Sequence, residues 1–208
     1  MINGEAGDSL LDTYEKERRE VALSTMRNTN RNADEIFDVV SSAMENDWDK
    51  VRALIAQSRR QGTGLGQDLG VTYSQGAFVS DGSEAAVTND PINDYQPSAR
   101  PGSRAPHLRI NRKNGQFSTL DFFGRNFVLL TGTDFPKNAS TGNSVNVFQN
   151  GKDFTADGFE ELYDITRRGA VLVRPDGYVG ARWPEARENF RREFQAAFQS
   201  ILGAPVSE

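Results

Sequence analysis

Apolar residues recur at helical spacing through the N-terminal part of the chain and predict three helices joined by short connections. The first helix begins at Asp8 or Ser9, either of which can cap it, and its apolar residues fall mainly on one face. A polar run at residues 27–32 interrupts the pattern, so we expect the first helix to end there. Asn32 and Glu35 have the spacing of a capping box, which predicts the start of the second helix.

The pattern changes after the third predicted helix, which covers residues 47–62 and ends at a glycine. Residues 62–70 are rich in glycine and are expected to form a connector. Residues 71–79 predict a strand, and a turn follows at residues 81–82. Residues 83–106 show little periodicity and contain four prolines, which indicates an extended linker or an ordered loop laid along a surface.

The C-terminal part has the signals of an α/β domain. The predicted strands are residues 108–110, 118–122, 127–130, 145–148, 170–173 and 178–181. A short helix is expected at residues 159–165. A last helix is predicted to open at Pro184 and to close at Gly203, with an apolar stripe that is typical of a core face. These elements predict a small sheet covered by helices.

Composition and charge exclude several classes of function. The net charge of −5 leaves no excess of positive charge for a nucleic acid or an anionic membrane, so neither is expected as a partner. The absence of cysteine excludes disulfides, thiolate metal sites and cysteine nucleophiles, and the single histidine excludes any site built on two. The sequence has no signal peptide and no run of about 20 apolar residues, which predicts a cytoplasmic protein.

His107 and the glycines near residue 64 are candidates for chemistry, but each has a simpler interpretation. His107 could act as a general base, yet no partner stands at a recognisable spacing, and a structural hydrogen-bonding histidine is the commoner case. Gly62, Gly64 and Gly66 follow a predicted helix, whose C-terminus carries partial negative charge and repels phosphate. We therefore favour structural roles for both features.

Two groups of charged residues remain. The carboxylates Asp153, Asp157, Glu160 and Glu161 do not have the spacing of a calcium loop and are expected to lie at a helix start or on a solvated face. The second group surrounds a proline-rich segment and could hold an anion or form ion pairs with another domain. It consists of Arg100, Arg104, Arg109 and Arg112. The interdomain interpretation fits a net-acidic protein better than nucleic-acid binding.

Four stretches of sequence, in order, resemble the motifs of one enzyme family, and the first is residues 10–19 (LLDTYEKERR). This stretch is similar to the LLDTYxxERRP segment of FAD-dependent aromatic hydroxylases of the phenol hydroxylase type. Tyr95-Gln96-Pro97 together with residues 101–107 (PGSRAPH) resembles the start of its C-terminal domain. Residues 118–124 (STLDFFG) and 169–179 (GAVLVRPDGYV) are similar to two later motifs. The four stretches cover most of the chain.

The resemblance implies a thioredoxin-like C-terminal domain preceded by a helical segment that corresponds to the tail of a flavin-binding domain. The implied division is 1–62 for the helical tail, 63–94 for a connector and 95–208 for the thioredoxin-like domain. Without cysteine, such a domain has no redox chemistry of its own. The glycine motifs that hold FAD in the family have no counterpart here, and Glu20 replaces a family proline. No catalytic, cofactor-binding or metal-binding residue can therefore be carried over.

These observations lead to a main hypothesis and two alternatives. The chain is expected to be the C-terminal part, truncated or split, of an FAD-dependent monooxygenase that hydroxylates a phenolic or polyketide-like aromatic. The complete enzyme would use FAD and NAD(P)H, and we expect this chain alone to bind neither. Its expected partner is a flavin-binding domain or subunit, or a second copy in a homodimer. The alternatives are a standalone, non-redox thioredoxin-like accessory module and a cofactor-free enzyme with a pocket at His107 or Asp121. The residues expected at the interface are Tyr14, Glu17, Arg18, Arg104 and His107.

Overall fold

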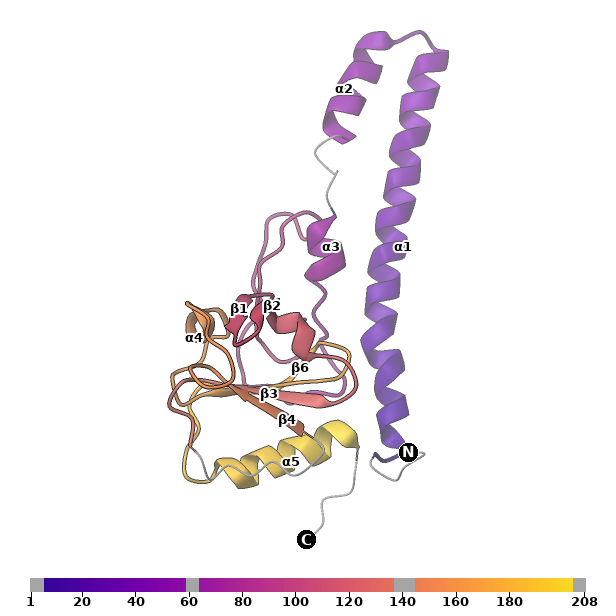
Figure 1. Cartoon of the computed structure of the whole chain (residues 1–208). Coiled ribbons are helices and arrows are strands. Elements are labelled where there is room, and N and C mark those ends of the chain that lie inside the picture. The colour runs from indigo at the N-terminus through magenta and orange to yellow at the C-terminus, as the bar shows by residue number, and fades with distance from the viewer. Residues whose placement is uncertain (1–5, 59–63, 137–144, 204–208) are drawn as a thin grey trace. The chain divides into compact units, whose positions relative to one another are not determined.

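The computed structural model describes residues 6–58, 64–136 and 145–203, and the chain divides into two units. The sheet unit comprises Met1–Lys16, Thr72–Ala86 and Pro97–Glu208. The helical unit comprises Glu17–Val71 and Val87–Gln96. Figure 1 shows the helices and strands of both units.

Helix α1 runs without a break over Ser9–Met44, so the predicted end at residues 27–32 and the predicted capping box at Asn32 are wrong. This polar run contains neither glycine nor proline, so the backbone hydrogen bonds of the helix can continue through it. Arg31 also stabilises the helix locally. Its guanidinium donates to the Asn28 side chain at 3.0 Å and lies 3.8 Å from the Glu35 carboxylate one turn later.

Helix α2, Trp48–Ser58, begins where the sequence predicts, whereas the glycine-rich connector contains a further helix. The backbone N–H of Lys50 donates to the Asp47 carboxylate at 3.0 Å, which caps α2. The additional helix, α3, covers Leu65–Leu69. A Cβ on Gly66 would lie 2.5 Å from the Pro91 carbonyl oxygen, so glycine is required here for close packing rather than for a loose connection.

A four-stranded sheet forms the centre of the sheet unit. Its strands are β3 (Phe127–Thr131), β4 (Val145–Gln149), β5 (Ala170–Val173) and β6 (Val179–Trp183). The order in the sheet is β4-β3-β5-β6, with β3 parallel to β4 and antiparallel to β5, and β5 antiparallel to β6. All four central strands lie at the positions that the apolar runs predict.

Two other predicted strands differ from the structure. Strands β1 (Arg109–Arg112) and β2 (Gly115–Ser118) form a separate hairpin, and residues 119–122 form the 3-10 helix η2 (Thr119–Phe122) instead of strand. The Ser118 hydroxyl caps η2 by accepting from the Leu120 N–H at 3.0 Å. Residues 71–79 form no regular strand, although the Val79 N–H donates to the Gly180 carbonyl at 2.8 Å beside β6.

Alternating residues of the sheet point into two separate cores. On one face Leu129, Leu172 and Ala181 pack with the apolar stripe of α5 (Phe190–Leu202), which lies along the sheet in Figure 1. On the other face the core contains strand residues, Ile110 of β1 and the two aromatic residues Phe159 and Tyr163 at helix α4 (Phe159–Leu162). Burial on both faces explains why β3 and β5 are almost continuously apolar, whereas the edge strand β4 has exposed residues.

The last helix begins later than predicted. α5 starts at Phe190, after Asn189, and not at Pro184. The Pro184 carbonyl accepts from the Thr166 N–H at 2.8 Å, and the Ala186 N–H donates to the Arg168 carbonyl at 3.1 Å. These bonds hold residues 184–186 beside the 166–168 loop, so the helix can form only after them. Gly203 ends α5 in the left-handed conformation (φ 61°), as predicted.

The fold class expected from the sequence is therefore confirmed. An N-terminal helical segment precedes a mixed sheet with a helix against each face, the thioredoxin-like α/β architecture that the resemblance implies.

Candidate functional site

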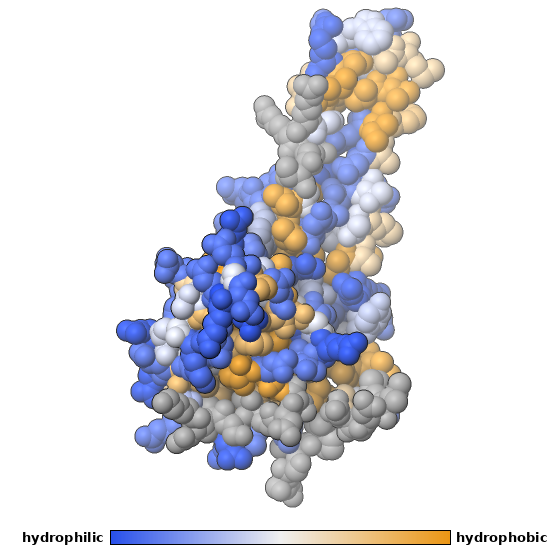
Figure 2. Space-filling view, viewed as in Figure 1, coloured by the Kyte–Doolittle hydropathy of each residue, from blue (hydrophilic) through white to orange (hydrophobic). Residues whose placement is uncertain are grey.

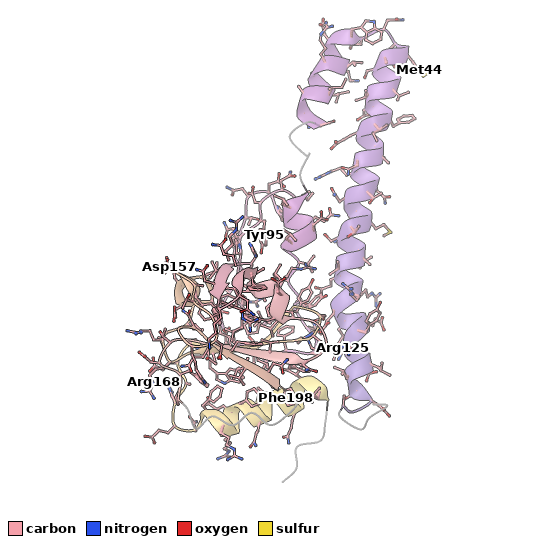
Figure 3. All side chains as sticks on the ribbon, viewed as in Figure 1. Met44, Tyr95, Arg125, Asp157, Arg168 and Phe198 are labelled. Atoms are coloured by element: carbon pink, nitrogen blue, oxygen red, sulfur yellow. The ribbon has the colours of Figure 1, made fainter. Side chains whose placement is uncertain are left out.

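The helical unit carries a band of exposed apolar side chains on α1 and α2, which we call the α1–α2 apolar face. It consists of Met26, Ile36, Phe37, Val40, Met44, Trp48 and Ile55. Figure 2 shows hydrophobic residues gathered at the α1–α2 end of the molecule, and Figure 3 labels Met44 there. Phe37 is 71% exposed and Met44 is 80% exposed, values that are unusual for such large apolar residues.

Helical spacing explains why the α1 members of this set share a face of that helix. Met26, Phe37 and Met44 are separated by about three and two whole turns of α1. Val40 lies one turn before Met44 on the same side. A contiguous exposed apolar surface of this kind marks an interaction site, because its burial against a partner releases about 25 cal/mol per Å².

Three of the residues expected at an interface lie on α1. Tyr14 is 68% exposed. Glu17 is buried, and both Glu17 and Arg18 have interaction partners within the chain. Tyr14 and Arg18 are thus exposed on the surface of α1, whereas Glu17 is not.

Arg104 and His107 are exposed residues of the sheet unit, and Ser103, Ala105 and Pro106 beside them are buried. The Arg104 guanidinium lies 5.9 Å from the centre of the Tyr178 ring. His107 Nδ1 lies 2.7 Å from the Ser118 hydroxyl, and within the described residues no ion pair joins His107 to a carboxylate. The nearby Asp121 carboxylate accepts the backbone N–H of Ser118 at 2.8 Å. The geometry thus gives His107 and Asp121 roles in fixing the start of η2.

Two buried arginines, which the sequence interpretation did not single out, attach the 77–81 segment to the sheet. Arg174, at the start of the β5–β6 turn, forms two hydrogen bonds with the Asp176 carboxylate (3.1 and 2.5 Å) and donates to the Ala77 carbonyl at 3.2 Å. Arg182 in β6 donates to Asp81 at 2.7 Å and to Asp164 at 2.8 Å. The signal for Arg182 was a charge inside an apolar strand, which requires a buried partner.

The electrostatic environment of Asp81 shows that this pair is structural. Burial alone raises the pKa of the Asp81 carboxyl, but hydrogen bonds from Ser83 and Arg182 outweigh burial and hold that pKa below its ordinary value. Asp81 is therefore a carboxylate at neutral pH and is fully used by its partners. It is not available as an acid or a base.

The glycine segment at α3 does not fit a phosphate or a flavin. Gly64 and Gly66 lie at the start of α3, where Gly66 faces the carbonyl oxygens of Pro91 and Asp94. Carbonyl oxygens repel a pyrophosphate, and at Gly66 they leave no room even for a Cβ. In the described ranges, no group of three or more histidine, aspartate or glutamate side chains could hold a metal ion. None of the described helices is long and apolar enough to cross a membrane.

The sequence profile described as "Aromatic-ring hydroxylase, C-terminal" matches residues 98–205. The chain belongs to this family. It is 30% identical to aklavinone 12-hydroxylase RdmE from Streptomyces purpurascens over 97% of this chain and 37% of that protein. It is 29% identical to 4-methyl-5-nitrocatechol 5-monooxygenase from a Burkholderia species, with the same coverage of each.

Solved structures of flavin-dependent hydroxylases also match this C-terminal part of an aromatic-ring hydroxylase. The flavin-dependent monooxygenase PieE, solved with FAD and substrate, matches 98% of this chain with a TM-score of 0.84 and 27% identity, over 42% of its own length. Aklavinone-11 hydroxylase, solved with FAD and aklavinone, matches 97% of this chain with a TM-score of 0.69 and 27% identity, over 37% of its length. The chain thus spans about two fifths of the hydroxylases that it matches, and it corresponds to their C-terminal portion.

Proposed function

We propose that this chain serves as the C-terminal part of a flavin-dependent aromatic hydroxylase and contributes a structural surface rather than reacting groups. In this proposal FAD, NAD(P)H and a phenolic or polyketide-like aromatic substrate bind to a separate flavin-binding domain or subunit. The proposed division of the chain is 1–62 for the helical tail, 63–94 for the connector and 95–208 for the thioredoxin-like domain. The observation that carries the proposal is the α1–α2 apolar face, in a family whose FAD-containing members are more than twice as long.

The composition of the face supports a protein partner over a small ligand. Its residues are exposed and are spread along two helices. A stable interface covers roughly 800 Å² on each partner, which a helix face of this length can supply. Aromatic residues and methionine, such as Phe37 and Met44, are enriched at protein interfaces.

The test uses the purified chain and the FAD-loaded flavin-binding part of RdmE, the portion that precedes the matched region. We expect the chain alone to leave FAD fluorescence unquenched and to run as a monomer in size-exclusion chromatography with light scattering. We expect it to co-elute with flavin absorbance when the flavin-binding part is added. The double substitution Phe37→Ser/Met44→Ser is expected to raise the Kd at least tenfold, about 1.4 kcal/mol.

A matched control separates the face from general loss of apolar surface. Val87 is 93% exposed in the same unit but lies outside α1 and α2, so Val87→Ser should leave the Kd unchanged. Stoichiometric FAD binding by the chain alone would refute the structural role. A homodimer that dissociates on substitution of Phe37 and Met44 would instead assign the face to a second copy.

A further inference from the structure

A groove with mixed aromatic and cationic walls lies in the sheet unit, between the β1–β2 hairpin and strand β4. We call it the Arg112 groove, and its volume is about 400 Å³. Its lining includes Arg112, Lys113, Phe117, Phe148, Lys152 and Asp153. None belongs to the α1–α2 apolar face, and the groove is independent of the proposed function.

Aromatic rings hold Arg112 in place. Its guanidinium carbon lies 5.3 Å from the ring centre of Phe122 and 5.8 Å from the centres of both Phe117 and Phe148. Phe122 and Phe148 are themselves stacked, with their centres 4.1 Å apart and their planes 16° apart. Ring faces attract the cation without using its N–H donors. Arg112 is therefore fixed in position while its hydrogen-bonding edge stays available.

The charges of the groove are unbalanced. No ion pair joins Arg112 to a carboxylate in the part of the chain that the structure describes. Asp153, the one carboxylate among the lining residues, accepts the backbone N–H of Gln149 at 2.9 Å and offsets a single positive charge. Lys113 and Lys152 add two further cations to the lining. A chain with a net charge of −5 thus has a local positive site at this groove.

The walls favour a ligand with both an anionic and an apolar part. Phe117 and Val147 are 37% and 41% exposed, and they offer apolar surface beside the cations. An inorganic anion would leave this surface uncovered. A volume of about 400 Å³ lies within the range of pockets for small molecules and below the extended groove that a peptide strand requires.

We propose that the Arg112 groove binds a small aromatic carboxylate. The carboxylate accepts hydrogen bonds from the Arg112 guanidinium, with Lys113 and Lys152 as further cations, and the ring lies against Phe117 and Val147. A planar guanidinium matches the two oxygens of a carboxylate, which gives the site geometric selectivity as well as charge. The proposal concerns binding alone and includes no chemical step.

The test is a titration of the whole chain with 2-naphthoate. Binding is measured by calorimetry and by the NMR signal of the Arg112 side-chain N–H. We expect saturable binding and a shift of that signal. Arg112→Gln should weaken binding at least tenfold, because a charge-assisted hydrogen bond is lost. Lys152→Gln should weaken it several-fold. Arg168→Gln, the control at an exposed arginine outside the groove (Figure 3), should leave the Kd unchanged.

The competing explanations predict different results. Equal binding of uncharged 2-naphthalenemethanol would show simple apolar adsorption and overturn the proposal, as would a failure to saturate at millimolar concentration. If phosphate competes as well as 2-naphthoate, the groove is an anion site without aromatic selectivity, and the proposal is wrong. If an acidic peptide binds more tightly than 2-naphthoate, the groove is a site for a protein instead. Circular dichroism checks that Arg112→Gln folds. If that variant unfolds, unchanged binding in Lys152→Gln overturns the proposal.

Discussion

Arg182 donates to two carboxylates at almost the same distance but in different surroundings, and this makes it a direct test of how burial sets the strength of an ion pair. The distances are 2.7 Å to Asp81 and 2.8 Å to Asp164. The Asp81 side chain is 11% exposed, whereas that of Asp164 is 78% exposed. With distance nearly constant, any difference in coupling must come from solvent screening.

Two double-mutant cycles measure the two couplings. Arg182→Met keeps the aliphatic stem, and it is combined in turn with Asp81→Asn and with Asp164→Asn. Asparagine suits residue 164 because its backbone is left-handed there (φ 51°), a conformation that asparagine tolerates. We expect a coupling of about 2 kcal/mol for Arg182–Asp81. For Arg182–Asp164 we expect less than about 1 kcal/mol, as for exposed pairs.

The assay is urea unfolding followed by Trp183 fluorescence. Trp48→Phe removes the other tryptophan, so the signal reports the sheet unit alone. The pH dependence gives a second test. Because the pKa of Asp81 is lowered on folding, its contribution is present above its unfolded pKa of about 3.9 and is lost as the pH falls through the lower folded value. Equal couplings, or a larger one for Asp164, would refute the screening argument.

Three further substitutions test other parts of the fold. Phe194→Ala should lower the free energy of unfolding by about 3–5 kcal/mol in the same urea assay, because Phe194 is buried against the sheet; Phe194→Leu should cost less. Gly66→Ala should disrupt the packing of α3 on Pro91, seen as faster amide hydrogen exchange around residues 64–70, while Asp68→Ala on the exposed side of α3 should not. Burial raises the pKa of Glu160, but hydrogen bonds from backbone N–H groups, Asn150 and Thr133 lower it overall. Glu160→Gln should therefore lower the free energy of unfolding by about 1–2 kcal/mol at pH 7. That loss should vanish as the pH falls through the folded pKa, since glutamate is then protonated; a constant loss down to acid pH would contradict it.

Strands β3, β5 and β6 of the central sheet could be predicted because they are buried on both faces. Burial on both faces produces short, continuous apolar runs, and a turn sequence such as residues 174–177 fixes the hairpin between two of them. The apolar stripe and the final glycine of α5 are equally local signals. Each of these features depends on neighbours within a few residues.

The errors arose where distant contacts determine the local structure. Pro184 has the sequence features of a helix start, but its carbonyl accepts a hydrogen bond from the Thr166 N–H. This partner cannot be inferred from the residues next to Pro184. The glycines near Gly66 suggested a loose connector. In the structure Gly66 packs closely against the carbonyl oxygens of Pro91 and Asp94, which are distant in the sequence. The predicted end of the first helix at residues 27–32 was wrong for a different reason. Polarity alone does not end a helix when the polar residues include no glycine or proline.

The candidate surfaces could be predicted only in part, because exposure is a property of the fold. The α1–α2 apolar face and the stripe of α5 look alike in sequence, since both repeat large apolar residues at helical spacing. In the structure Phe194 is 1% exposed and Phe37 is 71% exposed. The sheet supplies a partner for α5 within the chain. The apolar face of α1 and α2 has no such cover within the described residues, and this difference in cover, rather than any catalytic motif, is the physical reason for the interdomain role that we propose.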